Sequence, residues 1–271
     1  MKKLFIILAS AMVICSCSAE NQLNAQQADK PWNVSVYLDL SDRLTKGNGE
    51  PQTLRDTAII SNVIKLYVDN VVKHKIVPCN DKFQVFFYPT VGIQNASAVS
   101  NALKVDLEQY TKTPAMKKKV LLSMQQDILQ NVDTIYKSTL QNNRWLGSDI
   151  WGFFKNKIKI SCVREGYRNI LVVLTDGYIY HANSRVAHGN EYSYLLQSNI
   201  SKPGTKLIKC NDGLDNLEVL FLEINPSQFS HTEKMQDIIG TWMKEMGVRH
   251  YEVVETDVTA NITPAVSQFF K

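Results

Sequence analysis

The sequence lacks the features that mark several large classes of protein. Its 30 Lys and Arg residues stand against 26 Asp and Glu, a net charge of +4, and no dense basic block occurs. Charge therefore gives no indication of nucleic-acid binding, and we expect none. No Cys-x-x-Cys pair is present, which argues against a structural zinc site or a thioredoxin-type centre. With 44% hydrophobic and 21% charged residues in a chain of 271, the composition excludes disordered, collagen-like and multi-spanning membrane proteins.

The common motifs of catalytic and nucleotide-binding sites are also missing. Residues 39–49 contain no Gly-x-Gly-x-x-Gly. The chain has no Gly-x-Ser-x-Gly elbow, no Walker loop and no His-Glu-x-x-His motif. A haloacid-dehalogenase-like phosphatase needs a second Asp two places after its nucleophile, and Ser41 stands two places after Asp39. We identify no catalytic constellation and expect the chain not to be an enzyme. Of the possible functions, the sequence gives a hydrolase the least support.

The N-terminus has the pattern of an export signal. Two lysines precede an apolar stretch over residues 4–14, which is too short to span a bilayer as a mature helix. The following Ser16-Cys17 resembles a bacterial lipobox, in which a small residue precedes the cysteine that is lipidated. The resemblance implies a signal peptide over residues 1–16 and a membrane anchor on Cys17. The alternative is a plain secretory signal cleaved near Ala19.

Residues 17–30 are polar and rich in Gln, Asn and Ala, which predicts a flexible tether. Either reading of the N-terminus sends the chain out of the cytoplasm. The lipobox resemblance places it in a bacterial cell envelope. Ser18, rather than Asp, follows the predicted anchor, which favours the outer membrane over the inner one.

Three of the five cysteines remain once residues 1–16 are removed and Cys17 is lipidated. An oxidising envelope would permit one disulfide among them. Cys162 and Cys210 are the candidates, because each lies a few residues before a predicted strand. The alternative is three unpaired buried thiols.

Hydrophobic patterning predicts alternating strands and helices over residues 31–271, which we interpret as one domain. Strands are expected at 33–40, 83–88, 169–174, 217–224 and 250–254. Helices are expected at 53–75, 150–158, 230–246 and 264–271, the first opening on a capping-box-like Thr53-Leu54-Arg55-Asp56. Residues 95–143 predict a pair of helices, either inserted or packed on one face of the sheet. The alternation implies an α/β fold, doubly wound, with a mainly parallel central sheet flanked by helices.

Polar side chains follow two of these strands and precede one short helix. Asp39 and Ser41 follow the first strand, and Asp176 follows the strand at 169–174. Ser148 stands just before the helix at 150–158. Ligands of an open parallel sheet gather at the carboxyl ends of its strands. Carboxylate and hydroxyl oxygens there suit Mg²⁺, which favours octahedral oxygen coordination.

This pattern resembles a von Willebrand factor A-type domain with a metal-ion-dependent adhesion site. That family has Asp-x-Ser-x-Ser after its first strand, a Thr in a middle loop and an Asp in a later Thr-Asp-Gly turn. Asp39 and Ser41 match the first two motif positions, Ser148 matches the Thr, and Asp176 matches the last Asp. The resemblance covers residues 32–271. It implies Mg²⁺ or Mn²⁺ on these four residues, with a coordination position open to a carboxylate of a partner protein.

One position departs from the family pattern. Arg43 stands where the motif has its second Ser, and a guanidinium cannot ligate a cation and would repel one if it pointed inward. The site stays open to a cation if Arg43 turns away instead, to pair with Asp42 or Asp149. The alternative function is a metal-free scaffold or assembly lipoprotein on the same fold.

Aromatic residues follow the last predicted ligand closely and suggest a binding rim. Aromatic side chains are enriched at the centres of protein interfaces. The alternative is that the tyrosines pack their loop onto the domain. The predicted rim residues are Tyr178, Tyr180, His181 and Tyr192.

Overall fold

The computed structural model describes most of the predicted domain. The described residues are 30–45, 50–74, 76–88, 93–142, 147–181, 187–188, 191–192, 195–255 and 259–271. The predicted signal peptide, Cys17 and the tether up to residue 29 lie outside them. Among the described residues, no helix is both long enough and apolar enough to cross a membrane.

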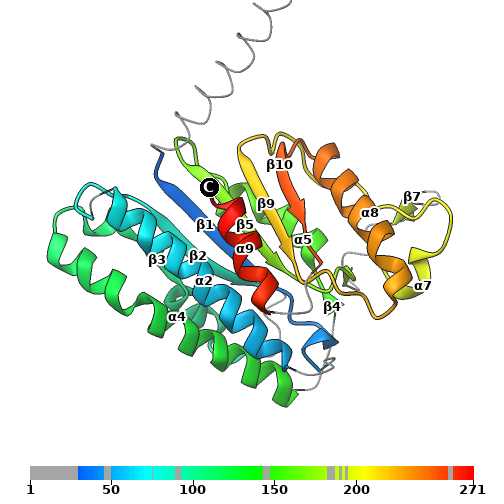
Figure 1. Ribbon diagram of the computed structural model, residues 1–271, viewed down its shortest axis with the longest axis horizontal. Helices are drawn as coiled ribbons and strands as arrows, with labels where there is room; N and C mark the ends of the chain where they lie inside the picture. The colour runs from blue at the N-terminus through cyan, green and yellow to red at the C-terminus, as the bar shows by residue number, and fades with distance from the viewer. Residues whose placement is uncertain are drawn as a thin grey trace, which may run out of the picture.

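A six-stranded sheet forms the centre of the fold (Figure 1). Its strand order is β10-β9-β5-β1-β2-β3, in which all pairs are parallel except that of β2 with the edge strand β3. The strands are β1 (Trp32–Leu38), β2 (Lys82–Phe87), β3 (Lys104–Asp106), β5 (Arg168–Leu174), β9 (Leu217–Leu222) and β10 (His250–Val253). The predicted α/β fold with a mainly parallel sheet is confirmed.

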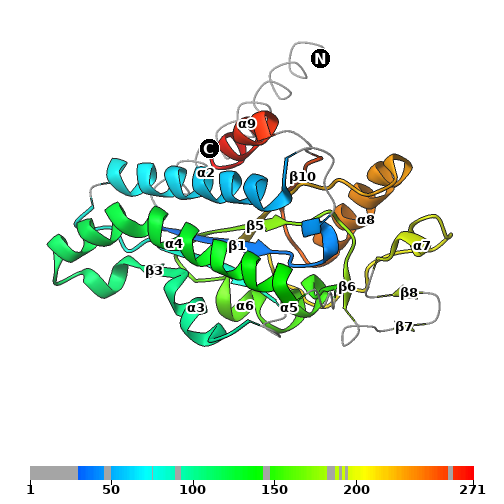
Figure 2. The ribbon, with the colours of Figure 1, turned by 90° about the horizontal axis from the view of Figure 1, so that it is seen from below.

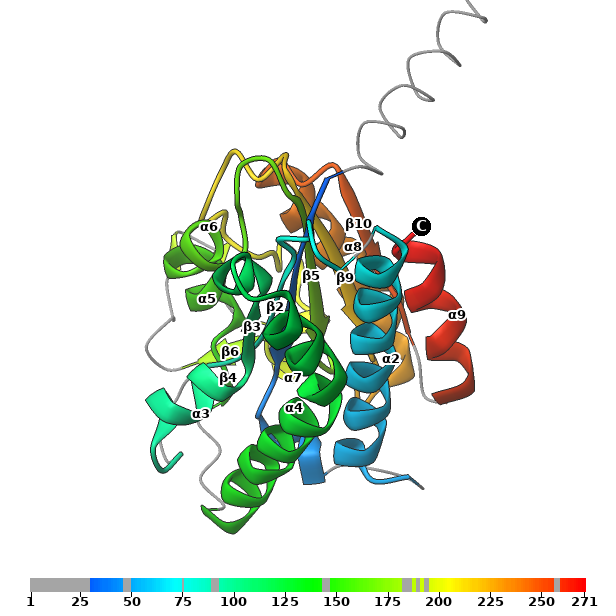
Figure 3. The same cartoon turned by 90° about the vertical axis from the view of Figure 1, so that its left-hand side faces the viewer.

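Helices cover both faces of this sheet (Figure 2). Figure 3 shows α2 and α9 on one side of the strands and α5 and α6 on the other. The first face carries α2 (Gln52–Lys73), α4 (Pro114–Asn142) and α9 (Thr259–Phe269). The second face carries α5 (Ile150–Asn156), α6 (Ile158–Ser161) and α8 (Thr232–Glu245).

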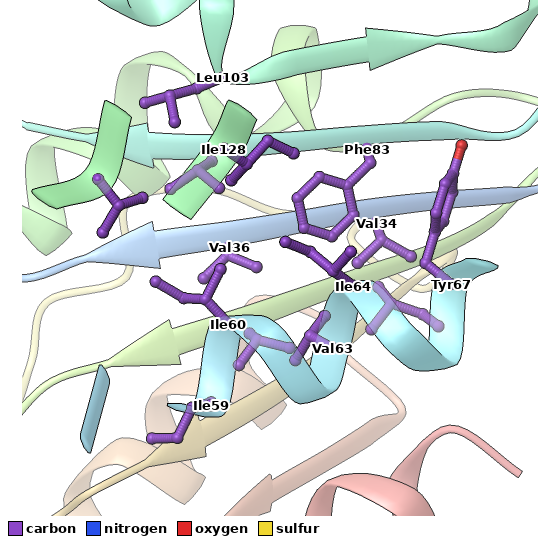
Figure 4. Packing of buried hydrophobic residues seen from close by; sticks show 14 of the residues in the cluster. Val34, Val36, Ile59, Ile60, Val63, Ile64, Tyr67, Phe83, Leu103 and Ile128 are labelled. Carbon is purple, nitrogen blue, oxygen red and sulfur yellow. The ribbon is translucent and has the colours of Figure 1, made fainter. Parts of the chain in front are cut away.

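Alternation along the central strands explains the two hydrophobic cores. Successive side chains of a strand point to opposite faces. Val34 and Val36 of β1 accordingly belong to the core under α2 and α4, whereas Tyr37 belongs to the core under α5 and α8. Figure 4 shows the two valines facing Ile60 and Ile64 of α2. All seven residues of β1 and of β5 are buried, as expected for strands covered on both faces.

The segment 95–143 differs from the expected pair of helices. It begins with a short helix, α3 (Ala96–Ala102), continues through the edge strand β3 and a 3-10 turn, η2 (Leu107–Tyr110), and ends in α4. Leu121, Met124 and Ile128 of α4 lie in the same core as α2. The segment therefore packs on one sheet face and also extends the sheet, because β3 pairs antiparallel with β2.

The predicted capping box at the start of α2 is wrong. Pro51 occupies the N-cap position, and no side chain caps the helix. Asp56 is fully buried and binds Arg43 instead.

The predicted bridge between Cys162 and Cys210 is not formed, and none of the three described cysteines belongs to a disulfide. The Cys210 thiol lies 3.7 Å from the backbone carbonyl oxygen of Trp151 and 3.8 Å from the sulfur of Met246. Cys162 is fully buried at the end of α6. Burial raises the pKa of each of these two thiols to about 12 and that of Cys79 to about 11.

A buried ion pair holds the C-terminal helix at the amino edge of the sheet. Arg168 donates two hydrogen bonds of 2.8 Å to the carboxylate of Glu218, and others of 2.8 and 3.2 Å to the carbonyl oxygens of Phe270 and Phe269. His250 lies 2.9 Å from the same carboxylate and stacks on Phe269. Burial alone would raise the pKa of Glu218, but the bonds from Arg168 and His250 outweigh it and lower the pKa to about 2.

Replacing Glu218 by Gln should remove a pH-dependent part of the stability. The native pKa lies below the ordinary value of 4.5, so this stability is complete above the ordinary value and is lost as the pH falls toward 2. The Glu218→Gln variant should be less stable by up to about 3 kcal/mol at pH 7. The difference should shrink toward pH 2, as measured by denaturant unfolding. Glu165→Gln, at an exposed position, is the control, and a pH-independent difference would contradict the assignment.

Candidate functional site

Three parallel strands end at one edge of the sheet and bring polar side chains together there (Figure 1). Asp39 follows β1, Thr175 and Asp176 follow β5, and Glu223 follows β9. A short antiparallel pair, β4 (Gly147–Ser148) with β6 (Tyr180–His181), adds a second layer. We call this edge the carboxyl edge.

Asp39 is the most enclosed of the predicted ligands. Its side chain is fully buried. One carboxylate oxygen accepts a hydrogen bond of 2.9 Å from the backbone N–H of Ser41, and the other accepts one of 2.7 Å from the hydroxyl of Thr175. No described cation forms a salt bridge with this carboxylate. The hydrogen-bond donors to this buried carboxylate are therefore neutral, while the charge of Arg43 acts on it without a direct hydrogen bond.

Ser148 has a buried hydroxyl without a hydrogen-bond partner. The residue is 2% exposed, and its Oγ makes no hydrogen bond. The neighbouring hydroxyl of Tyr37 donates instead to the carbonyl oxygen of Tyr88, at 2.9 Å. Burial, aided by Asp39 and Asp149, raises the pKa of Tyr37 well above 10. A buried polar atom left unpaired is uncommon in native proteins and calls for an explanation.

The turn after β5 is fixed by its own side chains. The backbone N–H of Gly177 donates to the hydroxyl of Thr175 at 3.1 Å, and that of Tyr178 donates to the half-buried carboxylate of Asp176 at 3.0 Å. Gly177 has φ +92°, and a Cβ there would lie 2.0 Å from the sulfur of Met235. Only glycine fits, so the path from Thr175 to Tyr178 is closely determined.

The predicted rim residues lie in different environments. Tyr178 is half-buried, and its hydroxyl lies 3.1 Å from Nδ1 of His231. Tyr180 is half-buried opposite Ser148.

His181 is buried, with Nδ1 3.6 Å from the carboxylate of Asp149, so it lines the interior rather than an exposed rim. Tyr192 belongs to the short strand β8 (Glu191–Tyr192), and its side chain lies outside the described part of the chain.

The guanidinium of Arg43 pairs with neither Asp42 nor Asp149, the two partners predicted for it. Its guanidinium donates to the carboxylate of Asp56 in α2, at 2.7 and 3.3 Å, and to that of Glu223 at 3.2 Å. Its Nε donates to the backbone carbonyl oxygen of Asp39 at 3.0 Å. The guanidinium therefore fixes the backbone of Asp39 without binding its carboxylate.

Further groups complete a buried cluster around this arginine. Arg55 donates to Glu223 at 3.1 Å, and Gln52 bridges Arg55, Asp56 and Glu223. The hydroxyl of Tyr136 in α4 donates to Asp56 at 2.6 Å. We call Arg43, Gln52, Arg55, Asp56, Tyr136 and Glu223 the charge cluster.

Opposing effects act on the two acids of the charge cluster. Burial raises the pKa of Asp56, but Arg43 outweighs it and lowers the pKa below its ordinary value. Burial and the neighbouring Asp56 raise the pKa of Glu223 to about 8. Glu223 also has φ +65°, a conformation that costs a non-glycine residue free energy and persists only where contacts enforce it.

The donor types at the carboxyl edge are those that a hard cation takes. Asp39 and Asp176 carry carboxylates, and Ser41 and Ser148 carry hydroxyls. The buried, unpaired hydroxyl of Ser148 would fit a ligand of such an ion. Within the described ranges, no cluster of three or more His, Cys, Asp or Glu side chains suited to a metal ion occurs.

Comparison with known proteins gives little beyond a distant structural likeness. No family model matches the chain, and no curated protein matches it. Two crystal structures of the pilus adhesin SpaC from Lactobacillus rhamnosus GG are similar, with TM-scores of 0.45 and 0.43 and identities of 12% and 11%. They match 90% and 89% of this chain, which spans 31% and 30% of theirs.

Replacing Arg43 by Met should destabilise the domain strongly. The change leaves the buried carboxylate of Asp56 without its cation and Glu223 without a hydrogen-bond donor, and breaking a buried pair in this way costs about 3–5 kcal/mol. The matched control is Arg249→Met, which breaks an exposed 3.8 Å pair with Asp215 and should cost no more than about 1 kcal/mol. Denaturant unfolding measures both. An Arg43→Met loss as small as that of the control would contradict the role given to the charge cluster.

Proposed function

We propose that this chain is a lipid-anchored protein of a bacterial cell envelope that binds a partner protein at the carboxyl edge of its sheet. In this proposal Mg²⁺ or Mn²⁺ is held by Asp39, Ser41, Ser148 and Asp176, as the von Willebrand factor A resemblance implies. The observation that carries the proposal is the fully buried carboxylate of Asp39, which has no salt-bridge partner among the described residues. A buried charge is costly unless it is paired or bound to a metal.

Two further observations support the cation. The buried hydroxyl of Ser148 lacks a partner that a bound ion would supply. Arg43 donates its hydrogen bonds to the carboxylates of Asp56 and Glu223 and not to that of Asp39, although its charge also acts on the Asp39 carboxylate. Thr175 orients that carboxylate through a 2.7 Å hydrogen bond.

The proposed role is recognition rather than reaction. A cation held by two carboxylates and two hydroxyls would keep coordination positions for water or for one carboxylate of a partner. The half-buried Tyr178 and Tyr180 lie on the segment that follows Asp176 and would border the entering group. Localisation to the outer membrane through Cys17 belongs to the same proposal.

Calorimetric titration of residues 31–271 with Mg²⁺ and Mn²⁺ tests the cation. We expect saturable binding that Asp176→Ala abolishes, with a loss of unfolding free energy of only about 1 kcal/mol, because this half-buried carboxylate also accepts the turn hydrogen bond of Tyr178. The control variant, Asp212→Ala, removes an exposed carboxylate that pairs with Lys159 and should bind as the unaltered chain does. Absence of binding, or equal binding by Asp176→Ala, would remove the cation from the proposal.

Membrane fractionation of the full chain tests the anchor. Cys17→Ala should move the protein from the membrane fraction to the soluble fraction and remove the lipid mass from its N-terminus, whereas Cys79→Ala should do neither. Unchanged partition of Cys17→Ala would refute lipidation at this residue.

A second function, a metal-free scaffold or assembly lipoprotein on the same fold, is favoured by one observation. Arg43 stands at the third motif position and has its charge satisfied within the charge cluster. A chain that works in this way would bind its partner equally well in the presence of a chelator. Chelator sensitivity of partner binding therefore separates the two functions.

A further inference from the structure

A pocket of about 280 Å³ lies at the amino edge of the sheet, where the parallel strands begin. It is lined by Lys30 and Pro31 before β1, by His74 after α2 and by residues 78–81 before β2. Figure 1 shows the start of β1 beside the end of α2, away from the carboxyl edge. The volume lies just below the range of about 300–1,000 Å³ that is usual for drug-sized ligands, so the pocket suits a smaller molecule. We call it the amino-edge pocket.

The base of the amino-edge pocket is a buried carboxylate without a cation. Asp81 is 2% exposed, whereas Lys30 and Pro78 are exposed, so the pocket leads from the surface to this carboxylate. One oxygen of Asp81 accepts hydrogen bonds from the backbone N–H of Trp32 at 2.8 Å and from the side-chain amide of Asn70 at 3.3 Å. No salt bridge joins Asp81 to a cation in the described part of the chain. A buried charge of this kind is costly unless a partner pairs with it.

The two buried lysines near the pocket have other partners. The ammonium group of Lys82 donates to two carboxylates of the β3–η2 segment, at 2.7 and 2.6 Å. That of the fully buried Lys117 donates to the backbone carbonyl oxygens of Val77 and Cys79, at 2.9 and 2.6 Å. These two bonds hold the turn that forms one wall of the pocket. The pocket is therefore preformed, which lowers the free-energy cost of binding.

Two polar atoms at this corner of the domain also lack partners. Oδ1 of Asn80, a residue that lines the pocket, is buried and makes no hydrogen bond. The hydroxyl of Tyr67 is likewise buried and unpaired, and burial, followed by the charge of Asp81, raises its pKa well above 10. Buried unpaired polar atoms call for an explanation. A bound ammonium group, which carries three N–H donors and a positive charge, would supply a partner to Asn80 and Asp81 together.

A positive group lines the same pocket at its exposed side. Lys30 is exposed and does not pair with Asp81, although both border the cavity. His74 adds no charge in its neutral form, because its Nδ1 donates to the carbonyl oxygen of Asn70, at 2.9 Å, and its second nitrogen is then an acceptor. Asp81 would repel a simple carboxylate, and Lys30 would repel a simple amine. A molecule that carries both an ammonium group and a carboxylate matches the two ends of the pocket.

We propose that the amino-edge pocket binds a small free amino acid as a zwitterion, with its α-ammonium group on Asp81 and Asn80 and its α-carboxylate on Lys30. Pro31 and Pro78, which have no backbone N–H, would border its side chain. The inference does not rest on the proposed partner-binding function. The ligands of that function follow the strand ends at the opposite edge of the sheet.

Saturation-transfer NMR on the purified full chain tests whether the pocket takes this class of ligand. The probes are the twenty common L-amino acids at millimolar concentration. We expect transfer to one or a few of the smaller ones. Absence of transfer to every amino acid would overturn the proposal.

Calorimetry with the amino acid that gives the strongest signal tests the two charges separately. Two analogues serve as probes, the amine that lacks the carboxylate and the carboxylic acid that lacks the ammonium group. The amine should bind about fivefold more weakly, because it loses a solvent-exposed ion pair. The acid should bind at least about tenfold more weakly, because it leaves the buried Asp81 without a cation. Equal binding of either analogue and the amino acid would overturn the zwitterion.

Variants of the lining residues locate the binding. Lys30→Met should weaken it by about fivefold, whereas the matched control Lys73→Met, at an exposed position in the last turn of α2 outside the pocket, should leave it unchanged. Equal affinities of these two variants would overturn the proposal. Lys30 is exposed, so the result does not depend on a change in folding.

Asp81→Asn should abolish binding, and denaturant unfolding shows whether the variant keeps its fold. A folded Asp81→Asn chain that binds as the unaltered chain does would overturn the proposal. Asp176→Ala should bind the amino acid normally, because Asp176 lies at the other edge of the sheet. Loss of binding in Asp176→Ala would place the amino acid at the carboxyl edge and so overturn the assignment to this pocket.

Discussion

The ion pairs of Arg43 tie together two of the strand ends at the carboxyl edge of this domain. One guanidinium joins the segment after β1 to α2 through Asp56 and to the end of β9 through Glu223. A buried charge that has such partners is stable in place, whereas the same charge alone would destabilise the edge. The backbone of Asp39 and the end of β9 are therefore held by the same side chain.

This coupling bears on how the carboxyl edge would bind a partner. Asp39 lies on one side of the arginine, and Glu223, which follows β9, lies on the other. A partner that contacted both strand ends would meet groups whose relative positions are already fixed. Less of its binding free energy would then be lost in ordering this domain.

The strands and most helices could be predicted from the sequence because their apolar patterns are long and periodic. The predicted strand at 169–174 matches β5 to within one residue, and the predicted helix at 53–75 differs from α2 by two residues at its end. The sequence could place Ser148 and Asp176 near strand ends because each stands beside a clear element; their role as ligands stays a prediction. The edge strand β3 was missed, because three residues are too few for a period to be visible.

The charge cluster could not be predicted, for physical reasons. Asp56 has the spacing of a helix cap, and only the fold shows that it is buried under Arg43. Glu223 looked like part of a strand, since the positive φ that ends β9 leaves no local trace in the sequence. The partners are 13 and 180 residues from Arg43 along the chain. Pairing of that kind depends on topology rather than on local pattern.

The buried thiols have a consequence for the folded domain in an oxidising compartment such as the proposed cell envelope. The thiolate, not the thiol, attacks disulfides. A cysteine of pKa about 12, such as Cys162 or Cys210, is ionised in only about one molecule in 10⁵ at pH 7. Once folded, the domain would resist mixed-disulfide formation in an oxidising compartment. Its lifetime there would be limited by the rate of unfolding rather than by reaction of its thiols.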